Sequence, residues 1–421
     1  MKTIQLLDFD WDNSTQQPIA TLTFYDGNAS LIETFLKQRV YDIVELNPWL
    51  LGSLRRDTHF NLVYSNDNIG DEFMRKRTII LTEDSQLNEC ADYNDIVIRI
   101  KSLNIMLSSF AVNKQDEALF RVGLIRISLN KFAIFFSLNH ALGDGNTFYQ
   151  LYGMINEKSK PRALIVDRLH EFCNTVEELT CYRSIFSGTR LLTFILKMIK
   201  KALFCKPYIG TIHSVDLSAI EDLKLKYKKQ SNDPDDFIST NDILTSYYFS
   251  NFGVDIGLMT VNGRSRFPQL SLDHAGNYLA RIHYQKGDFE LPSKIRASLK
   301  TLRRVNSDIP LPSSLFGKKF SFLTSWASLY MDVKLSDCSH IFHLPLLLPQ
   351  SVVRFGTLFW AKKGELKLLT LTKDKTLSRK TMQNPHNDFL HASQDKMINT
   401  VKDKIYLPTY PMTSLLSAKT L

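Results

Sequence analysis

The 421-residue sequence has few of the features that mark several large classes of protein. It contains only five cysteines, and no two of them have the C-x-x-C spacing of a metal or redox site. An odd number of scattered cysteines is typical of free thiols in a reducing compartment rather than of a disulfide framework. No apolar run approaches the roughly 18 residues that a membrane-spanning helix needs.

Signals for export and for nucleotide binding are also missing. The first residues, Met1 to Asp8, lack the apolar stretch of a secretory signal, so we expect a cytoplasmic protein. The sequence has no G-x-S-x-G nucleophile elbow, no phosphate-binding P-loop and no dinucleotide fingerprint. These absences argue against serine hydrolases of that type, P-loop nucleotide hydrolases and dinucleotide-dependent oxidoreductases.

Charge and composition are those of an ordinary globular protein. Hydrophobic residues make up 44% and charged residues 23% of the sequence, which suits one very large domain or two medium ones. The 52 Lys and Arg against 43 Asp and Glu give a net charge of +9, spread along the chain. We therefore expect no nucleic-acid partner. The excess suits an anionic ligand such as a nucleotide-bearing co-substrate, or an acidic carrier protein.

Hydrophobic periodicity predicts a mixed α/β architecture. Ser30 and Glu33 form an expected capping box at the start of the clearest helix, and Pro48 ends that helix. The other predicted helices span residues 146–155, 190–204 and 239–250. The predicted strands span residues 19–25, 60–64, 78–81, 96–100, 119–129, 132–138, 256–261, 278–284, 352–360 and 366–372.

The chain is expected to divide into an N-terminal lobe of residues 1–180, a crossover of residues 181–235 and a C-terminal lobe of residues 236–421. The polar, turn-rich residues 231–236 mark the boundary. The helix at 190–204 is basic with a wide apolar face, which is compatible with a peripheral membrane contact. Docking on the protein core is the interpretation that such a wide face favours. We expect a monomer.

The most informative stretch is residues 135–145, in which His140 follows an apolar, strand-like run and precedes Asp144-Gly145. A neutral imidazole can take a proton near neutral pH, since its ordinary pKa is about 6.5. To do so, it needs one nitrogen held and the other free for the substrate. Gly143 and Gly145 are expected to permit backbone angles that a side chain would forbid. The alternative is a core histidine without a chemical role.

Further short motifs follow in order along the chain. Residues 46–54 read LNPWLLGSL, residues 239–244 read STNDIL, residues 261–266 read VNGRSR with Gly276-Asn277 after them, and residues 324–326 read TSW. Together with the H-x-x-x-D-G of His140 to Gly145, they resemble the superfamily of chloramphenicol acetyltransferases, condensation domains and BAHD acyltransferases. The resemblance is closest to the BAHD group, whose corresponding motifs are YPLLAGRL, STNDxL, VDxRxR…GN and TSW.

This resemblance implies a two-lobed α/β fold with mixed sheets and an active-site channel between the lobes. It implies transfer of an acyl group from acyl-CoA to a small-molecule alcohol or amine, in secondary metabolism. Acyl-CoA would be a co-substrate, with no bound cofactor and no metal. His140 would be the general base that deprotonates the acceptor.

The resemblance also implies roles for the other motif residues. Asp144 would point away from the reacting groups and pair bidentately with Arg264, or with Arg266 as a fallback. Thr324 would donate a hydrogen bond to the oxyanion, while Trp326 would exclude water. Gly145 and Asn277 would give structural support.

Departures from the family pattern keep other functions open. The BAHD group has DFGWG after TSW, whereas residues 329–337 here read LYMDVKLSD. Asn139 stands where condensation domains usually have a second histidine, which argues against peptide-bond condensation. An acyl carrier protein as donor and a non-catalytic binding module remain alternatives. Cys338, His340 and His343 lack a second cluster to complete a tetrahedral site, so we expect no metal.

Overall fold

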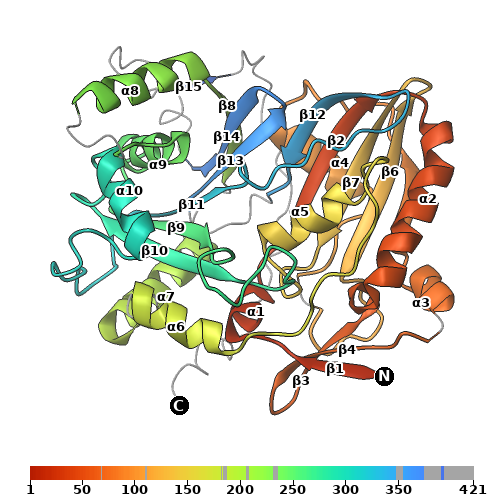
Figure 1. Ribbon diagram of the computed structural model, residues 1–421, viewed down its shortest axis with the longest axis horizontal. Coiled ribbons are helices and arrows are strands. Elements are labelled where there is room, and N and C mark those ends of the chain that lie inside the picture. Colours follow the sequence, from red (N-terminus) through yellow and green to blue (C-terminus); the bar gives the residue numbers. More distant parts are fainter. Residues whose placement is uncertain are drawn as a thin grey trace.

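The computed structural model describes residues 1–67, 69–109, 111–181, 183, 187–204, 208–230, 236–347, 354–373 and 390–392 (Figure 1). Its helices are α1 (Asp8–Asn13), α2 (Ala29–Leu46), the short 3-10 helix η1 (Pro48–Leu51), α3 (Ile69–Arg75), α4 (Tyr93–Ser102), α5 (Gly145–Gly153), α6 (Glu171–Thr180), α7 (Gly188–Phe204), α8 (Leu217–Gln230), α9 (Thr240–Asn251) and α10 (Pro292–Thr301).

The strands form three sheets in two lobes. They are β1 (Lys2–Gln5), β2 (Ile19–Asp26), β3 (Ser53–Arg56), β4 (Phe60–Tyr64), β5 (Ile79–Glu83), β6 (Phe120–Ser128), β7 (Lys131–Leu138), β8 (Ile209–Val215), β9 (Ile256–Asn262), β10 (Leu279–Gln285), β11 (Phe320–Ser325), β12 (Ser339–Pro345), β13 (Arg354–Lys362), β14 (Glu365–Thr372) and β15 (Leu390–Ala392). A small sheet has the order β1-β4-β3.

The first lobe is built on a five-stranded sheet of order β12-β2-β7-β6-β5, in which only the β5–β6 pair is parallel. Strand β7 is central and buried on both faces. Phe136 and Leu138 point into the core beneath α2 and α5, whereas Ala133 and Phe135 point into a second core shared with α4. Because both faces are covered, the strand reads as one continuous apolar run.

The second lobe is built on a seven-stranded sheet of order β10-β9-β11-β13-β14-β8-β15. Helices α6, α8, α9 and α10 contribute to the core on one face of this sheet. Phe359 and Leu369 face the other way, into the core that also holds Phe135 of β7. The two lobes are thus joined by a continuous apolar core.

Connections between the lobes cross the expected boundaries. Strand β12 comes from the C-terminal half of the chain but completes the first lobe's sheet beside β2. Strand β8, from the expected crossover, lies in the second lobe's sheet beside β14. Of the expected boundary segment, residues 231–235 lie outside the described part of the chain. The division into 1–180, 181–235 and 236–421 stays a prediction.

Most predicted elements lie where the sequence places them, with two exceptions. Residues 96–100, predicted as a strand, belong to helix α4, which Asp92 caps. Its buried residues Tyr93, Ile96, Val97 and Ile100 follow helical spacing, so the strand prediction was wrong. Helix α2 is capped by Asn28, not Ser30, because the Asn28 side chain accepts a hydrogen bond from the Ser30 amide.

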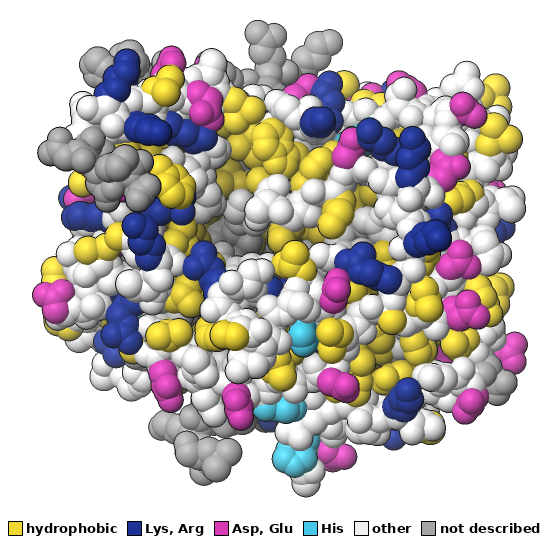
Figure 2. All heavy atoms as spheres, in the orientation of Figure 1, with side chains coloured by type: hydrophobic (Ala, Val, Ile, Leu, Met, Phe, Trp, Pro, Cys, Tyr) yellow, Lys and Arg dark blue, Asp and Glu magenta, His cyan; other side chains and the backbone are white. Residues whose placement is uncertain are grey.

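The surface carries no single dominant feature on the face in Figure 2. Lys and Arg side chains are scattered over it with acidic side chains between them, and hydrophobic side chains gather around a hollow between the lobes. Within the described residues, none of the helices is both long enough and apolar enough to span a bilayer.

Candidate active site

His140 lies in the turn that connects β7 to α5. Asp144 is the N-cap of α5, and its Oδ1 accepts a hydrogen bond from the Thr147 amide at 3.1 Å. Asn139 is buried and closes the turn, because its Oδ1 accepts from the Ala141 amide at 3.0 Å. The strand therefore delivers His140 to a fixed position, half-buried, at the end of a fully buried segment.

The glycines of this turn are required by space rather than by backbone angle. Neither Gly143 nor Gly145 has a positive φ, so the expectation of special backbone angles was wrong. A Cβ at Gly143 would lie 2.5 Å from the Thr147 side chain, and one at Gly145 would lie 3.1 Å from Leu329. Gly276, opposite, has a φ of +134° and also faces Arg168 at close range.

Asp144 points away from the surface and is paired with Arg264. The distance from Arg264 Nη1 to Asp144 Oδ2 is 2.7 Å, and neither side chain is exposed. The Tyr278 amide donates to the same oxygen at 3.0 Å. The pair is not the bidentate one expected, because Nε and Nη2 of Arg264 donate to the carbonyls of His274 and Gly276.

A second buried ion pair supports the turn from its other side. Asn277 Nδ2 donates to the His140 carbonyl at 2.7 Å and to Asp10 Oδ1 at 2.8 Å. Asp10 Oδ2 accepts from Arg168 Nε at 2.8 Å, with both side chains fully buried. Arg168 Nη2 in turn donates to the Leu142 carbonyl at 3.2 Å. Two neutralised ion pairs therefore hold the backbone around His140.

The environment of His140 favours the neutral form of its imidazole, because it lowers the pKa. Burial lowers the pKa of His140 below its usual value, and the nearby Arg281 guanidinium lowers it further. Its own carbonyl, Asp144 and Asn277 oppose this effect without reversing it. The Nδ1 atom of His140 is buried and has no hydrogen-bond partner of normal geometry in the described part of the chain. The sequence predicts that one ring nitrogen is held by a hydrogen bond, and Nδ1 is not held in this way. The position of His140 is therefore fixed through hydrogen bonds to the backbone of its turn rather than through a hydrogen bond to its Nδ1 atom.

Thr324 lies in a row of polar side chains across the second lobe's sheet. Arg281 pairs with Thr260 across β10 and β9, and Thr324 pairs with Thr357 across β11 and β13. Thr260 Oγ1 donates to Thr324 Oγ1 at 2.9 Å, which joins the two pairs. Because Thr324 accepts this hydrogen bond, its own hydroxyl proton is available to another acceptor. Cross-strand neighbours share a face, so the Thr324 hydroxyl lies on the same face of the sheet as Arg281.

Trp326 and the segment after it pack on α5. A Cβ on Gly145 would lie 3.8 Å from the Trp326 indole, and Trp326 also meets the Tyr149 ring edge-on at 5.9 Å between centroids. Residues 329–337, which replace DFGWG, continue along the same helix. Met331 lies against Gly153, and the Val333 carbonyl accepts from Tyr25 of β2 at 3.0 Å. This segment fixes α5 although it lacks the family motif.

Other candidate residues lie apart from His140. Arg266, the expected fallback partner of Asp144, donates instead to the Leu299 carbonyl at 2.7 Å. His343 has both ring nitrogens engaged, Nδ1 with Thr23 and Nε2 with Tyr149, each at 2.9 Å. Within the described residues no group of three His, Cys, Asp or Glu side chains could hold a metal ion.

Several residues of the site have no counterpart in the sequence prediction. They are Asp10, Asn13, Arg168, Thr260 and Arg281. Asp10 and Arg168 are 158 residues apart, and Asn13 and Arg281 are 268 apart. The available signal was the alternation of Asp8, Asp10 and Asp12 with two aromatic residues at positions 9 and 11.

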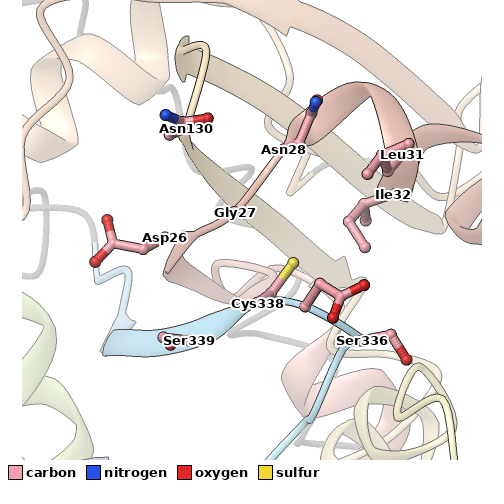
Figure 3. A pocket seen from close by; sticks show the side chains of 10 residues that line it. Asp26, Gly27, Asn28, Leu31, Ile32, Asn130, Ser336, Cys338 and Ser339 are labelled. Carbon is pink, nitrogen blue, oxygen red and sulfur yellow. The ribbon is translucent and has the colours of Figure 1, made fainter.

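A cavity of about 500 Å³ lies at the other end of β2 and β7 from His140 (Figure 3). The turn after β2, Asn130 between β6 and β7, and the start of β12 line it. Gly27 faces Cys338 there so closely that a Cβ would lie 2.4 Å from the Cys338 sulfur. The residues that line this cavity include neither His140 nor the residues that hold its turn, so the cavity is separate from the candidate active site.

Comparison with solved structures covers almost the whole chain. F. graminearum TRI101 complexed with coenzyme A and T-2 mycotoxin matches with a TM-score of 0.61 and 12% identity, over 93% of this chain and 99% of that one. Vinorine synthase matches at 0.60 and 12%, over 92% and 93%. The first condensation domain of the CDA synthetase matches at 0.56 and 10%, over 91% and 95%.

These matches show the chloramphenicol acetyltransferase-like fold that the motifs predicted. Neither a protein-family model nor a curated protein matches the sequence. At 10–12% identity the likeness establishes the fold, and function has to be argued from the site.

Proposed function

We propose that this protein is an acyltransferase that moves an acyl group from acyl-CoA to the hydroxyl or amino group of a small molecule, with His140 as general base. The observation that carries the proposal is the placement of a half-buried imidazole, whose pKa burial lowers, beside a carboxylate that is turned away to Arg264. The TRI101 structures, which contain coenzyme A or ethyl coenzyme A, support the choice of donor.

In this mechanism His140 removes the proton from the acceptor as its oxygen or nitrogen attacks the thioester carbonyl. A lowered pKa suits a base, because the imidazole is then unprotonated before the substrate arrives. The tetrahedral intermediate collapses by breaking the carbon–sulfur bond. His140 returns the proton to the leaving thiolate, which gives the ester or amide and free coenzyme A. The reaction requires no metal and no acyl-enzyme intermediate.

Thr324 and Trp326 have supporting roles in the proposal. The negative charge on the thioester oxygen needs a hydrogen-bond donor in place before the reaction. Thr324 fits this need because Thr260 already donates to it, which leaves the Thr324 proton for the oxyanion. Trp326, only 7% exposed and packed against the start of α5, shields the same region from water.

A carrier-protein thioester is the second candidate donor, favoured by the match to the CDA synthetase condensation domain. Asn139 argues against it, because the position before His140 is occupied by a buried amide that closes the turn. A non-catalytic binding module is the third candidate. The intact His140, Asp144 and Arg264 arrangement argues against this last one.

The proposal is tested by following free thiol release from a panel of acyl-CoAs with pooled small alcohols and amines. We expect wild-type turnover and a fall of about 10²–10⁴-fold in His140→Ala. The matched control is His59→Ala, which removes an exposed histidine far from α5 and should leave turnover unchanged.

The outcomes separate the candidates. Equal rates for His140→Ala and wild type would refute the general-base role. Turnover with acyl carrier protein thioesters, but with no acyl-CoA, would establish the second donor. The absence of turnover with either donor, in a protein that still binds coenzyme A by calorimetry, would favour the binding module.

A further inference from the structure

In the described part of the chain, helix α7 contacts the second lobe through Thr189, Thr193 and Phe194. Phe194 meets Phe320 of β11 edge-on, with 5.7 Å between ring centroids, beside a small core that includes Leu315. Thr189 donates to the Ser313 carbonyl at 3.0 Å, and Thr193 accepts from the Leu315 amide at 3.0 Å. The expected docking of this helix on the protein core therefore holds for the side that carries Phe194.

An adjoining side of α7 carries an apolar stripe that the described residues do not cover. Leu192 is 58% exposed, Leu196 49% and Ile199 39%. Their spacing of four and three residues places them within about 60° of the helix circumference. No other helix in the described part of the chain has three exposed large hydrophobic residues.

A neighbouring loop extends this stripe. Phe316 is 57% exposed and lies on the segment that hydrogen-bonds to α7. The Lys200 ammonium lies 5.9 Å from the centre of the Phe316 ring, so the loop and the helix meet at the surface. Isolated exposed apolar residues are common, but four large ones on adjoining elements form a patch.

The two segments that form the patch contain only basic charged residues. The α7 sequence, GTRLLTFILKMIKKALF, contains four basic residues and no acidic residue. The loop sequence at 313–319, SSLFGKK, adds two lysines and again no carboxylate. Across the whole chain, by contrast, basic and acidic residues are nearly balanced at 52 to 43.

We propose that the surface formed by Leu192, Leu196, Ile199 and Phe316 rests on an anionic lipid bilayer. An apolar stripe beside lysines is the pattern of a helix that lies in the bilayer interface, with its ammonium groups at the level of the phosphates. A protein partner would need acidic groups placed to match the lysines around the patch. A fluid anionic surface supplies them without shape matching. The helix is too short to span the bilayer and lies along its surface.

The proposal is tested by vesicle flotation of the full-length protein. We expect flotation with vesicles of phosphatidylcholine containing about 30% phosphatidylserine, and little with phosphatidylcholine alone. High salt should weaken the binding, because it screens the lysines. The double variant Leu192→Gln with Leu196→Gln should reduce vesicle partitioning at least about tenfold.

A matched control is Leu225→Gln with Leu129→Gln, which removes two leucines of 57% and 86% exposure from other parts of the surface. This control should float like the wild type. Lys200→Glu gives a second test that leaves the apolar side chains in place, and should weaken binding only to anionic vesicles. Circular dichroism and the urea midpoint verify that each variant is folded.

Three results would overturn the proposal. Wild-type protein that remains unbound at both lipid compositions would exclude the bilayer. Equal flotation of wild type and the Leu192/Leu196 variant would move the lipid contact elsewhere. Self-association of the wild type that the double variant abolishes, without any flotation, would assign the patch to a second copy of the chain. None of these results depends on acyl transfer.

Discussion

Replacement of Arg264 by lysine measures how far the site depends on the guanidinium rather than on a positive charge. Arg264 donates to Asp144 Oδ2, to the carbonyls of His274 and Gly276, and to Thr147 Oγ1, all within 3.2 Å. Lysine retains a cation for Asp144 but has one nitrogen in place of three. It therefore leaves at least the two carbonyls without this donor.

The expected cost follows from these contacts. The Gly276 carbonyl still accepts from the Asp144 amide and the Thr147 hydroxyl, so the His274 carbonyl is the one that loses its described donor. A buried acceptor without its donor costs about 1–3 kcal/mol, so Arg264→Lys should lose about that much unfolding free energy. Arg266→Lys is the matched control, because Arg266 is exposed and its side chain makes one described hydrogen bond, to the Leu299 carbonyl. Its loss should stay below about 1.5 kcal/mol.

The assay is urea unfolding followed by tryptophan fluorescence and by circular dichroism. Coincident transitions by the two probes are needed before a free energy is extracted. Equal midpoints for Arg264→Lys and Arg266→Lys would refute the reasoning, since the His274 carbonyl would then be satisfied without the guanidinium. A large loss in both variants would mean that the segment tolerates no lysine at all.

The remaining predictions concern the second ion pair, the hydroxyl row and acid stability. Asp10→Asn leaves the buried Arg168 charge unpaired and should cost about 3–5 kcal/mol in urea unfolding, whereas Asp8→Asn, at an exposed ion pair, should cost about 1 kcal/mol or less. Thr324→Val should lower the rate of acyl transfer by about 10²–10³-fold, and Thr324→Ser should restore most of it; equal rates for the two variants would contradict an oxyanion role. Burial lowers the pKa of His213 to about 4, so the unfolded chain takes up a proton that the folded chain does not, and stability falls as the pH drops from about 6.5 toward 4. His213→Gln should remove about 3 kcal/mol of that acid-induced loss, and an unchanged pH dependence of the urea midpoint would count against it.

Local features of this fold were predictable from the sequence because they depend on neighbours in the chain. The hairpin that ends at His140 follows from two apolar runs around a turn at residues 130–131. The capping box of α9 follows from Ser239 and Asp242, whose side chains each bond the other's backbone. Helix α4 was missed because Ile96, Val97 and Ile98 read as a β-branched strand, although the buried positions repeat with helical spacing.

The supporting network of the site was not predictable in the same way. The family motifs led to Arg264 and Asn277, but the contact between Asp10 and Arg168 joins segments that no local pattern connects. The requirement for Gly143 was misjudged for a related reason. It depends on where Thr147 comes to lie in three dimensions, and the sequence contains only the residue types.

The position of β12 has a consequence for the synthesis of the protein on the ribosome. Thr23 of β2 and His343 of β12 are hydrogen-bonded neighbours but lie 320 residues apart. At typical translation rates β2 therefore waits roughly 15–60 s for this partner strand. During that interval the edge of the first sheet is open to pairing with other nascent chains. Chaperone occupancy of the N-terminal lobe should therefore persist until β12 has been synthesised, and a transcript that stops before β12 should yield an aggregating product.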